Sequence, residues 1–388
     1  MAVVGIICEY NPFHNGHLRQ LTQIRQRLGA DTAIVCLMSG RFVQRGDAAL
    51  FAPAVRAAAA ADCGADLVLE LPATHSLRSA EGFAAGGVDI LSRLGVVDAL
   101  CFGAEHADTA ALLQTARMLC SADYDAALRA ALQTRGSYAA AREQALRTLG
   151  GDGALLQRPN DILAAEYCKA ILQQGSRMQP LCITRGGDYH SMEADAENPS
   201  ATAVRALWPD GGWRALVPEA AARHYAGAET FTLAAGERAV LARLRGMTPA
   251  QWQDVPYGAE GLWRCVYKAV QRAGSVEEII ETAKSKRYVR TRLQRMVLCA
   301  YLGLTAAELA RRAEYVRVLA LGSGGGALLR RIRREGALAC LNAGARAPDG
   351  AQAEIEARCA GLSTLFSTGT GAPAAALAQN DRIYRRKI

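Results

Sequence analysis

The chain of 388 residues contains no apolar run of the ~18 residues that a helix needs to span a bilayer. Its start lacks the basic region of a signal peptide, and Glu9 interrupts the first apolar run early. The eleven cysteines form no CxxC pair, and Cys8, Cys36, Cys101 and Cys299 each stand alone in apolar stretches. We therefore expect buried, reduced thiols in a cytoplasmic protein, with neither a disulfide framework nor a zinc site.

Aromatic residues make up only 6% of the chain while alanine is abundant, which favours helices over an all-β fold. The length indicates more than one domain. The net charge of +8 is unevenly distributed: residues 1–200 hold 17 Lys and Arg against 21 Asp and Glu, and residues 201–388 hold 28 against 16. A basic second half indicates a polyanionic partner such as nucleic acid, or a basic surface that serves solubility.

Short apolar runs without alternation are separated by helical patterns through the first hundred residues, which is typical of parallel strands buried on both faces. The expected strands are Val3–Cys8, Thr32–Met38, Asp66–Leu71, Val97–Phe102 and, later, Pro180–Thr184. Residues 1–210 are predicted to form a doubly wound α/β domain with a parallel sheet, of Rossmann-like type.

The cluster Pro209–Gly212 marks the predicted domain boundary, so residues 211–388 form the second, basic domain. This domain is expected to be mostly helical. Within it, Tyr315–Leu321 and Ala337–Leu341 are predicted strands around the helix Leu328–Arg334. The glycine run Gly322–Gly326 is interpreted as a tight turn, since no acidic ribose partner follows it at a suitable spacing.

The first strand–helix turn contains neither a GxGxxG fingerprint nor a Walker lysine, which excludes a dinucleotide site and a P-loop there. It does contain His14 and His17 at a helix start, with Gly16 between them. Residues three apart share a helix face, so both imidazoles can donate to one phosphate at the positive end of the helix. They are candidate catalytic residues that stabilise a phosphorus transition state. Two surface histidines are the alternative; a metal site is not predicted, because no third ligand has suitable spacing.

The stretch Asn11–His17 resembles the HxGH motif of the nucleotidyltransferase superfamily, and Ser200–Arg205 resembles its second, phosphate-holding signature. Other stretches are similar to the bacterial tRNA(Met) cytidine acetate ligase family: Gly5–Tyr10, Met38–Gly40, Phe42–Gly46, Gly64–Pro72, Phe102–Glu105, Arg158–Leu163, Ile183–Gly186, Tyr257–Leu262 and Lys284–Tyr288. The resemblance covers essentially the whole chain.

That resemblance implies an enzyme that activates acetate with ATP as acetyl-adenylate and transfers the acetyl group to N4 of the wobble cytidine of elongator tRNA(Met). A Mg²⁺ ion would accompany the ATP. The implied ATP-binding residues are Ile7, Cys8, Glu9, Tyr10, Asn11, Pro12, Phe13, His14, Asn15, Gly16, His17, Leu18, Arg19, Gln20, Gly103, Asn160, Arg185, Gly186, Ser200, Thr202 and Arg205.

A cluster of cations in the second half is the expected tRNA-binding segment, because phosphate contacts dominate affinity for nucleic acids. It consists of Lys284, Lys286, Arg287, Arg290, Arg292 and Arg295. A solvated charged helix is the alternative for this cluster. The sequence does not determine the oligomeric state.

Two positions depart from the family pattern: Arg41 replaces a small polar residue, and Phe51–Ala60 is richer in alanine than in relatives. Because of these two departures, the resemblance does not indicate which residues of this chain contact acetate or RNA. One rival function is an adenylyltransferase or cytidylyltransferase acting on a small cofactor precursor, which has no need for a basic second half. The other is a non-catalytic RNA-binding protein, against which His14, His17 and Arg205 argue.

Overall fold

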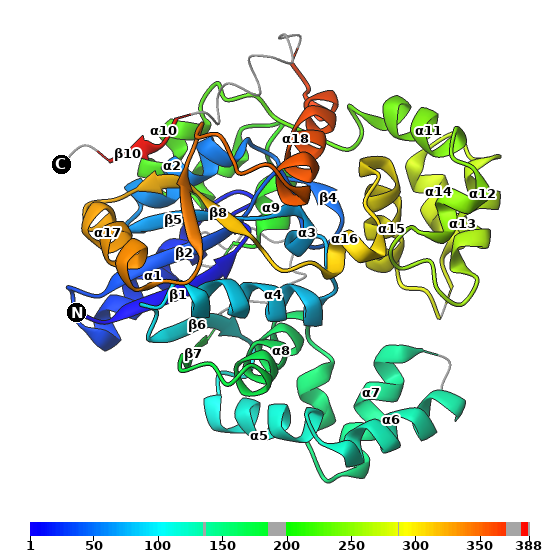
Figure 1. The fold of residues 1–388 in the computed structure, drawn as a ribbon, viewed down its shortest axis with the longest axis horizontal. Helices are drawn as coiled ribbons and strands as arrows, with labels where there is room; N and C mark the ends of the chain where they lie inside the picture. The colour runs from blue at the N-terminus through cyan, green and yellow to red at the C-terminus, as the bar shows by residue number, and fades with distance from the viewer. Residues whose placement is uncertain (135–136, 185–198, 286, 370–381, 387–388) are drawn as a thin grey trace.

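A computed structural model describes residues 1–134, 137–184, 199–285, 287–369 and 382–386. Its centre is an eight-stranded sheet in the order β10-β8-β5-β2-β1-β6-β7, with β9 also paired to β8 (Figure 1). The strands are β1 (Val3–Cys8), β2 (Ala33–Ser39), β5 (Leu67–Leu71), β6 (Ala99–Ala104), β7 (Gln179–Thr184), β8 (Tyr315–Leu321), β9 (Ala339–Asn342) and β10 (Tyr384–Arg385).

The five strands that the first half contributes to this sheet are all parallel to one another, and their order reverses between β1 and β6. Ligands of such sheets bind where neighbouring connections leave in opposite directions, outside the carboxyl ends of the strands. The reversal therefore places the expected ligand crevice outside the carboxyl ends of the strands, between the turn that follows β1 and the end of β6.

Helices cover both faces of the sheet, as the non-alternating strands predict. Val3 and Ile7 of β1 pack into one core with α4 (Ala80–Arg93), α8 (Pro159–Gln173) and α17 (Gly325–Glu335). Val4, Ile6 and Cys8 pack into the opposite core with α1 (Asn15–Leu28), α2 (Pro53–Asp62) and α10 (Glu219–Tyr225). The prediction of a doubly wound α/β fold is confirmed.

Further helices lie within the described ranges. They are α3 (Ala73–Ser76), α5 (Thr109–Leu119), α6 (Ala122–Thr134), α7 (Tyr138–Thr148), α9 (Ala201–Ala206), α16 (Ala306–Ala310) and α18 (Ala351–Ser363), with 3-10 turns at Gly153–Leu156, Gly212–Leu216 and Thr364–Phe366. No helix within the described ranges is long and apolar enough to cross a membrane.

A separate group of helices, called the helical lobe below, projects from one side of the sheet (Figure 1). It consists of α11 (Glu237–Arg245), α12 (Pro249–Gln253), α13 (Leu262–Val270), α14 (Val276–Ala283) and α15 (Arg290–Leu302). These helices share an apolar core that also takes in Phe42 and Ala48 of a small hairpin and Ile355 and Cys359 of α18.

The helical lobe is joined to the sheet domain through the small hairpin of β3 (Phe42–Val43) and β4 (Asp47–Ala48). Gly46 in the hairpin turn has φ +81°, and a Cβ there would lie 2.4 Å from the backbone N of Arg295. The backbone of α15 therefore touches the hairpin directly, which only a glycine permits.

One feature of the second half differs from expectation, since β8, β9 and β10 belong to the central sheet and not to a helical unit. β8 pairs antiparallel with β5, from Leu67↔Leu321 to Leu69↔Val318. An apolar run predicts a buried strand but not which strand it pairs with. The boundary near residue 210 stays a prediction.

The glycine run after β8 is a close-packed turn, as interpreted from the sequence. The N–H of Gly322 donates to the Asp66 carbonyl at 2.8 Å, and the N–H of Gly324 donates to Asp66 Oδ1 at 3.2 Å. A Cβ at Gly325 would lie 2.1 Å from the Asp66 carbonyl oxygen. The glycines thus allow the start of α17 to approach β5.

Candidate active site

The turn Glu9–His14 carries the chain from the carboxyl end of β1 to the first residue of α1. Tyr10 has φ +42°, an uncommon conformation for a residue with a side chain. Its ring packs edge-on against Phe13 and His17, each at 4.8 Å between ring centres. Buried aromatic packing therefore holds the strained backbone and places the two histidines.

The two histidines lie against each other, with ring centres 3.7 Å apart and ring planes 29° apart. The backbone N–H of His14 donates to Nδ1 of His17 at 3.2 Å. An N–H group can only donate, so Nδ1 accepts, and the neutral ring of His17 carries its proton on Nε2. His17 thereby offers an Nε2–H donor at the helix start, the position that binds phosphate best.

The N-terminus of α1 favours an anion for a further reason: its first turn contains no acidic residue. Gly16 lies in this turn, where a Cβ would come 3.1 Å from Cε1 of His14 and 3.8 Å from the Pro199 carbonyl oxygen. Gly16 thus leaves a narrow space between His14 and Pro199, the residue before Ser200. The histidine motif and the Ser200–Arg205 signature therefore lie next to each other.

Arg205 connects the two signatures directly. Its Nη1 donates to the carbonyl of Asn11 at 2.7 Å, and its Nη2 donates to Oγ1 of Thr202 at 3.3 Å. Ser200 begins α9, and its Oγ accepts the Ala203 N–H at 3.0 Å. The structure therefore brings together residues that are almost two hundred positions apart, and it fixes the guanidinium beside the turn.

Two residues that support the turn were missed from the sequence. The hydroxyl of Tyr225 accepts the N–H of Phe13 at 2.9 Å, and its ring stacks on Phe51 at 4.7 Å. Arg56, fully buried, donates to the carbonyls of Glu9, Ser39, Gly40 and Phe51. A lone arginine within an alanine-rich helix was a signal for this role, whereas nothing local indicated Tyr225.

Glu9 links the turn to the hairpin, because its Oε1 accepts the Gln44 N–H at 2.7 Å. Burial raises the pKa of Glu9 above its usual range. Nη1 of Arg295 in turn donates to the Gln44 carbonyl at 3.3 Å. This chain of contacts connects the turn to the helical lobe.

Gly103 and Asn160 lie on the other side of the expected crevice. Gly103 is near the end of β6, paired with Ile183 of β7. Asn160, in the first turn of α8, donates from Nδ2 to Oε1 of Glu105 at 2.7 Å, and Glu105 follows β6 directly. Both positions therefore border the carboxyl edge next to the β1 turn, while Arg185 and Gly186 lie outside the described residues.

The remaining positions of the first stretch have mixed surroundings. Ile7 and Cys8 are buried in β1, and Nε2 of Gln20 lies 3.6 Å from Sγ of Cys101. Asn15 donates from Nδ2 to the Ala215 carbonyl at 3.1 Å. Pro12 is buried in the turn, and Leu18 and Arg19 continue α1, where Leu18 packs against the core of that sheet face. Their contact with a nucleotide stays a prediction.

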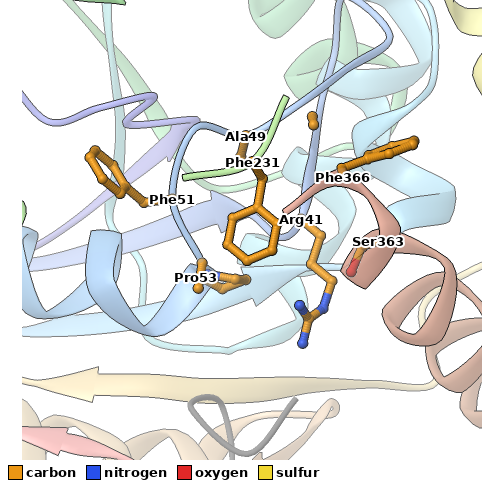
Figure 2. A pocket seen from close by; sticks show the side chains of 9 residues that line it. Arg41, Ala49, Phe51, Pro53, Phe231, Ser363 and Phe366 are labelled. Atoms are coloured by element: carbon orange, nitrogen blue, oxygen red, sulfur yellow. The ribbon is translucent and has the colours of Figure 1, made fainter. Parts of the chain in front are cut away.

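The two departures from the family pattern meet at one small pocket (Figure 2). Arg41 supplies its guanidinium, and Phe51 begins the loop that leads into α2. The apolar side chains of Phe231 and Phe366 also line the pocket, and the ring of Phe231 lies beside Arg41. The two departures from the family pattern therefore lie close together in space. The neighbouring loop contacts the catalytic turn, because the Leu50 N–H donates to Oδ1 of Asn11 at 2.7 Å.

Three of the five described cations of the predicted tRNA-binding segment have acidic partners. Lys284 lies 3.3 Å from Glu281, Arg287 2.9 Å from Glu260, and Arg290 2.6 Å from Glu281. Arg290 also pairs with Glu277. Lys286 lies outside the described residues.

The other two arginines of α15, Arg292 and Arg295, instead contact protein backbone. Arg292 donates from Nη2 to the Tyr257 carbonyl at 2.9 Å. Arg295 is only 8% exposed and points to the hairpin, and burial lowers its pKa. This arrangement does not fit a phosphate contact by Arg295, so RNA binding by this segment stays a prediction.

Among the described residues, no group of three or more His, Cys, Asp or Glu side chains is placed to hold a metal ion. The donor set around the turn is instead rich in N–H groups: two imidazoles, a guanidinium and a helix N-terminus. Such a set fits a polyanion like the phosphates of a nucleotide.

The chain matches the family model described as HIGH Nucleotidyl Transferase over residues 1–370. It is 34% identical to the tRNA(Met) cytidine acetate ligase of Acetivibrio thermocellus over 87% of each chain. It is 38% identical to that of Syntrophotalea carbinolica over 86% of this chain and 83% of the relative.

Two crystal structures of Thermotoga maritima TmcAL, one apo and one bound with alpha-thio ATP, match at 26% identity over 100% of both chains. Their TM-scores are 0.90 and 0.88, respectively. Sequence, fold and site geometry agree, and the chain belongs to the tRNA(Met) cytidine acetate ligase family.

Proposed function

We propose that this chain activates acetate with ATP and transfers the acetyl group to N4 of the wobble cytidine of elongator tRNA(Met). The observation that carries the proposal is the hydrogen bond between Arg205 and the Asn11 carbonyl, which unites both phosphate signatures beside the histidine pair. ATP would lie across the turn Ile7–Gln20, with Gly103 and Asn160 on the facing side, and Arg185 and Gly186 are proposed as further ATP-binding residues.

In the first step an acetate oxygen attacks the α-phosphorus, the new P–O bond forms, and the bond to the β-phosphate breaks as pyrophosphate leaves. Negative charge gathers on the α-phosphate oxygens during this displacement. Nε2–H of His17 and the imidazole of His14, at the positive end of α1, would stabilise that charge. Arg205, Ser200 and Thr202 would hold the departing pyrophosphate.

In the second step N4 of cytidine attacks the acetyl carbonyl carbon. The C–N bond forms, the bond to AMP breaks, and N4 loses one proton. A carboxylate is a poor electrophile, and adenylation makes its carbonyl carbon reactive by providing a good leaving group. An exocyclic amine is a poor nucleophile, and its reaction is accelerated because the enzyme holds it next to that carbon. The unstacked bases of an anticodon loop make the amine accessible.

A Mg²⁺ ion would enter with the ATP phosphates, as is usual for a cation that keeps several of its own waters. A cytoplasmic location would give the enzyme both ATP and tRNA. The chain's own residues supply the hydrogen-bond donors and the positive helix end.

The decisive experiment is ATP–pyrophosphate exchange with and without acetate, together with transfer of labelled acetate to tRNA. Acetate-dependent exchange with label on a tRNA cytidine is the expected result. Exchange without RNA labelling would instead indicate an adenylyltransferase or cytidylyltransferase acting on a small cofactor precursor. A complete lack of exchange would leave a non-catalytic RNA-binding protein.

A further inference from the structure

The outer face of helix α13 carries a row of cations at four-residue spacing: Arg264, Lys268 and, just beyond the helix end, Arg272. All three side chains are exposed. Residues four apart lie on one face of a helix, about 6 Å from one another along its axis. Arg264 and Lys268 therefore share one exposed face of α13, and Arg272 adds a third cation just beyond the end of the helix.

No ion pair with a described carboxylate neutralises this row, in contrast to the segment Lys284–Arg295. The sequence from Leu262 to Val276 contains no acidic residue at all. The nearest carboxylates on either side are already engaged, Glu260 with Arg287 and Glu277 with Arg290. The positive charge of the row is thus available to an external anion.

Packing on the inner face holds the helix that carries the row in place. Leu262, Val266, Ala269 and Val270 are buried in the lobe core. Arg245 of α11 donates from Nη2 to the Ala273 carbonyl at 2.7 Å, which holds the end of α13 and adds a further charge beside Arg272. Since the helix backbone is already ordered, only the side chains of the row lose conformational entropy when they bind phosphates.

The position of the lobe suits a long anion that also reaches the catalytic turn. The chain of contacts from Glu9 through Gln44 to Arg295 joins the turn to α15. In Figure 1, α15 stands between the sheet and α13, so α13 forms the side of the lobe away from the sheet. A ligand bound to both places must therefore extend well beyond a mononucleotide.

We propose that Arg264, Lys268 and Arg272 form the main phosphate-binding edge for the tRNA backbone, and that the ion-paired segment Lys284–Arg295 contributes little. The inference rests on the proposed function, and it names the surface that the tRNA contacts outside its wobble base. Positive charge on α13 and negative charge on the RNA backbone are complementary, and each phosphate contact releases counterions.

The test compares three variants of the full chain for binding of unmodified elongator tRNA(Met) transcript at several salt concentrations. The first is Arg264→Ala with Lys268→Ala and Arg272→Ala. The second is Arg287→Ala with Arg290→Ala. The third removes the same charge elsewhere on the surface, as Arg117→Ala with Arg129→Ala and Arg177→Ala, all of which are exposed.

The first variant is expected to lose about tenfold or more in affinity and about two to three units of the log–log salt slope, because the slope falls by about 0.9 per lost contact. The other two variants should stay within about twofold of the unchanged chain. Acetate-dependent ATP–pyrophosphate exchange should be unchanged in all three, which shows that they fold.

Unchanged tRNA affinity in the first variant, with exchange intact, would overturn this surface and leave the proposed function standing. A larger loss in the second variant than in the first would overturn it as well. If the unchanged chain neither binds the transcript nor exchanges pyrophosphate with acetate, both proposals fail together.

Discussion

In the turn Glu9–His14, polar groups are held by residues far away in the chain, such as Arg205 and Tyr225. In the segment Lys284–Arg295, exposed cations are held by carboxylates of the same lobe, as Arg290 is by Glu281. The first region is buried and organised around donors that point to one place. In the second region, exposed cations form ion pairs with carboxylates of the same protein. A dense cluster of cations is therefore not by itself a binding surface.

The largest effect should come from His17→Ala, since this change removes a donor aimed at the developing charge. We expect acetate-dependent exchange to fall by about 10²–10³. The affinity for tRNA should be nearly unchanged. Exchange kinetics and a tRNA binding curve on the same preparation measure both, and loss of both together would indicate a folding role.

His17→Gln is the matched control, because glutamine at the third helix position can still accept the His14 N–H. It should restore thermal stability but not exchange. Recovery of full exchange in this variant would show that His17 acts only through the helix start.

Arg205→Lys should have the next largest effect. Lysine keeps the charge but loses the fork that contacts both Asn11 and Thr202, so exchange should fall by about tenfold to a hundredfold. Arg214→Lys serves as control, since Arg214 is exposed and lies over Trp213 at 4.9 Å. If both changes have equal effects on exchange, the Arg205 bridge has no special role.

Gly46→Ala tests the junction between the two regions. Its Cβ would lie 2.4 Å from the Arg295 backbone, so the free energy of unfolding should fall by about 1–3 kcal/mol. Gly227→Ala has a similar positive φ of +73° but nothing within 4 Å of the new Cβ. Denaturant unfolding of both variants isolates the clash, and equal losses would show that the contact is unimportant.

The smallest effect is expected for Arg290→Ala, although it removes ion pairs with both Glu277 and Glu281. Exposed pairs contribute at most about 1 kcal/mol, and less in high salt. Unfolding at two salt concentrations measures this contribution. A loss of several kcal/mol in the free energy of unfolding would show that these ion pairs organise the lobe. The difference between this segment and the catalytic turn would then be smaller than we infer.

Sequence patterns predicted the sheet well because strands that are buried on both faces form runs of apolar residues, as in Val3–Cys8, where all six residues are buried. The histidine motif was equally clear, since its residues are adjacent in the chain. The hairpin of β3 and β4 was missed because two-residue strands carry no period.

What escaped prediction depends on neighbours in space. Tyr225 lies 212 positions from the Phe13 N–H that it accepts, and its own surroundings in sequence are those of any amphipathic helix. The pairing of Arg287 with Glu260 is equally invisible, because the two residues come from different elements. The charge of a segment can be counted from the sequence. The sequence does not show, however, whether that charge is free to bind a ligand or is already paired within the protein.

The antiparallel strand β8 has a consequence for how the molecule is made. Strand β5 leaves the ribosome long before its edge partner, since Leu67 pairs with Leu321. Until then the growing polypeptide carries an open sheet edge next to the nearly complete nucleotide site, and such edges invite association with other chains. The sheet of the catalytic unit is therefore completed only after β8 has been synthesised, and a polypeptide that stops before β8 would expose the edge of β5 to other chains.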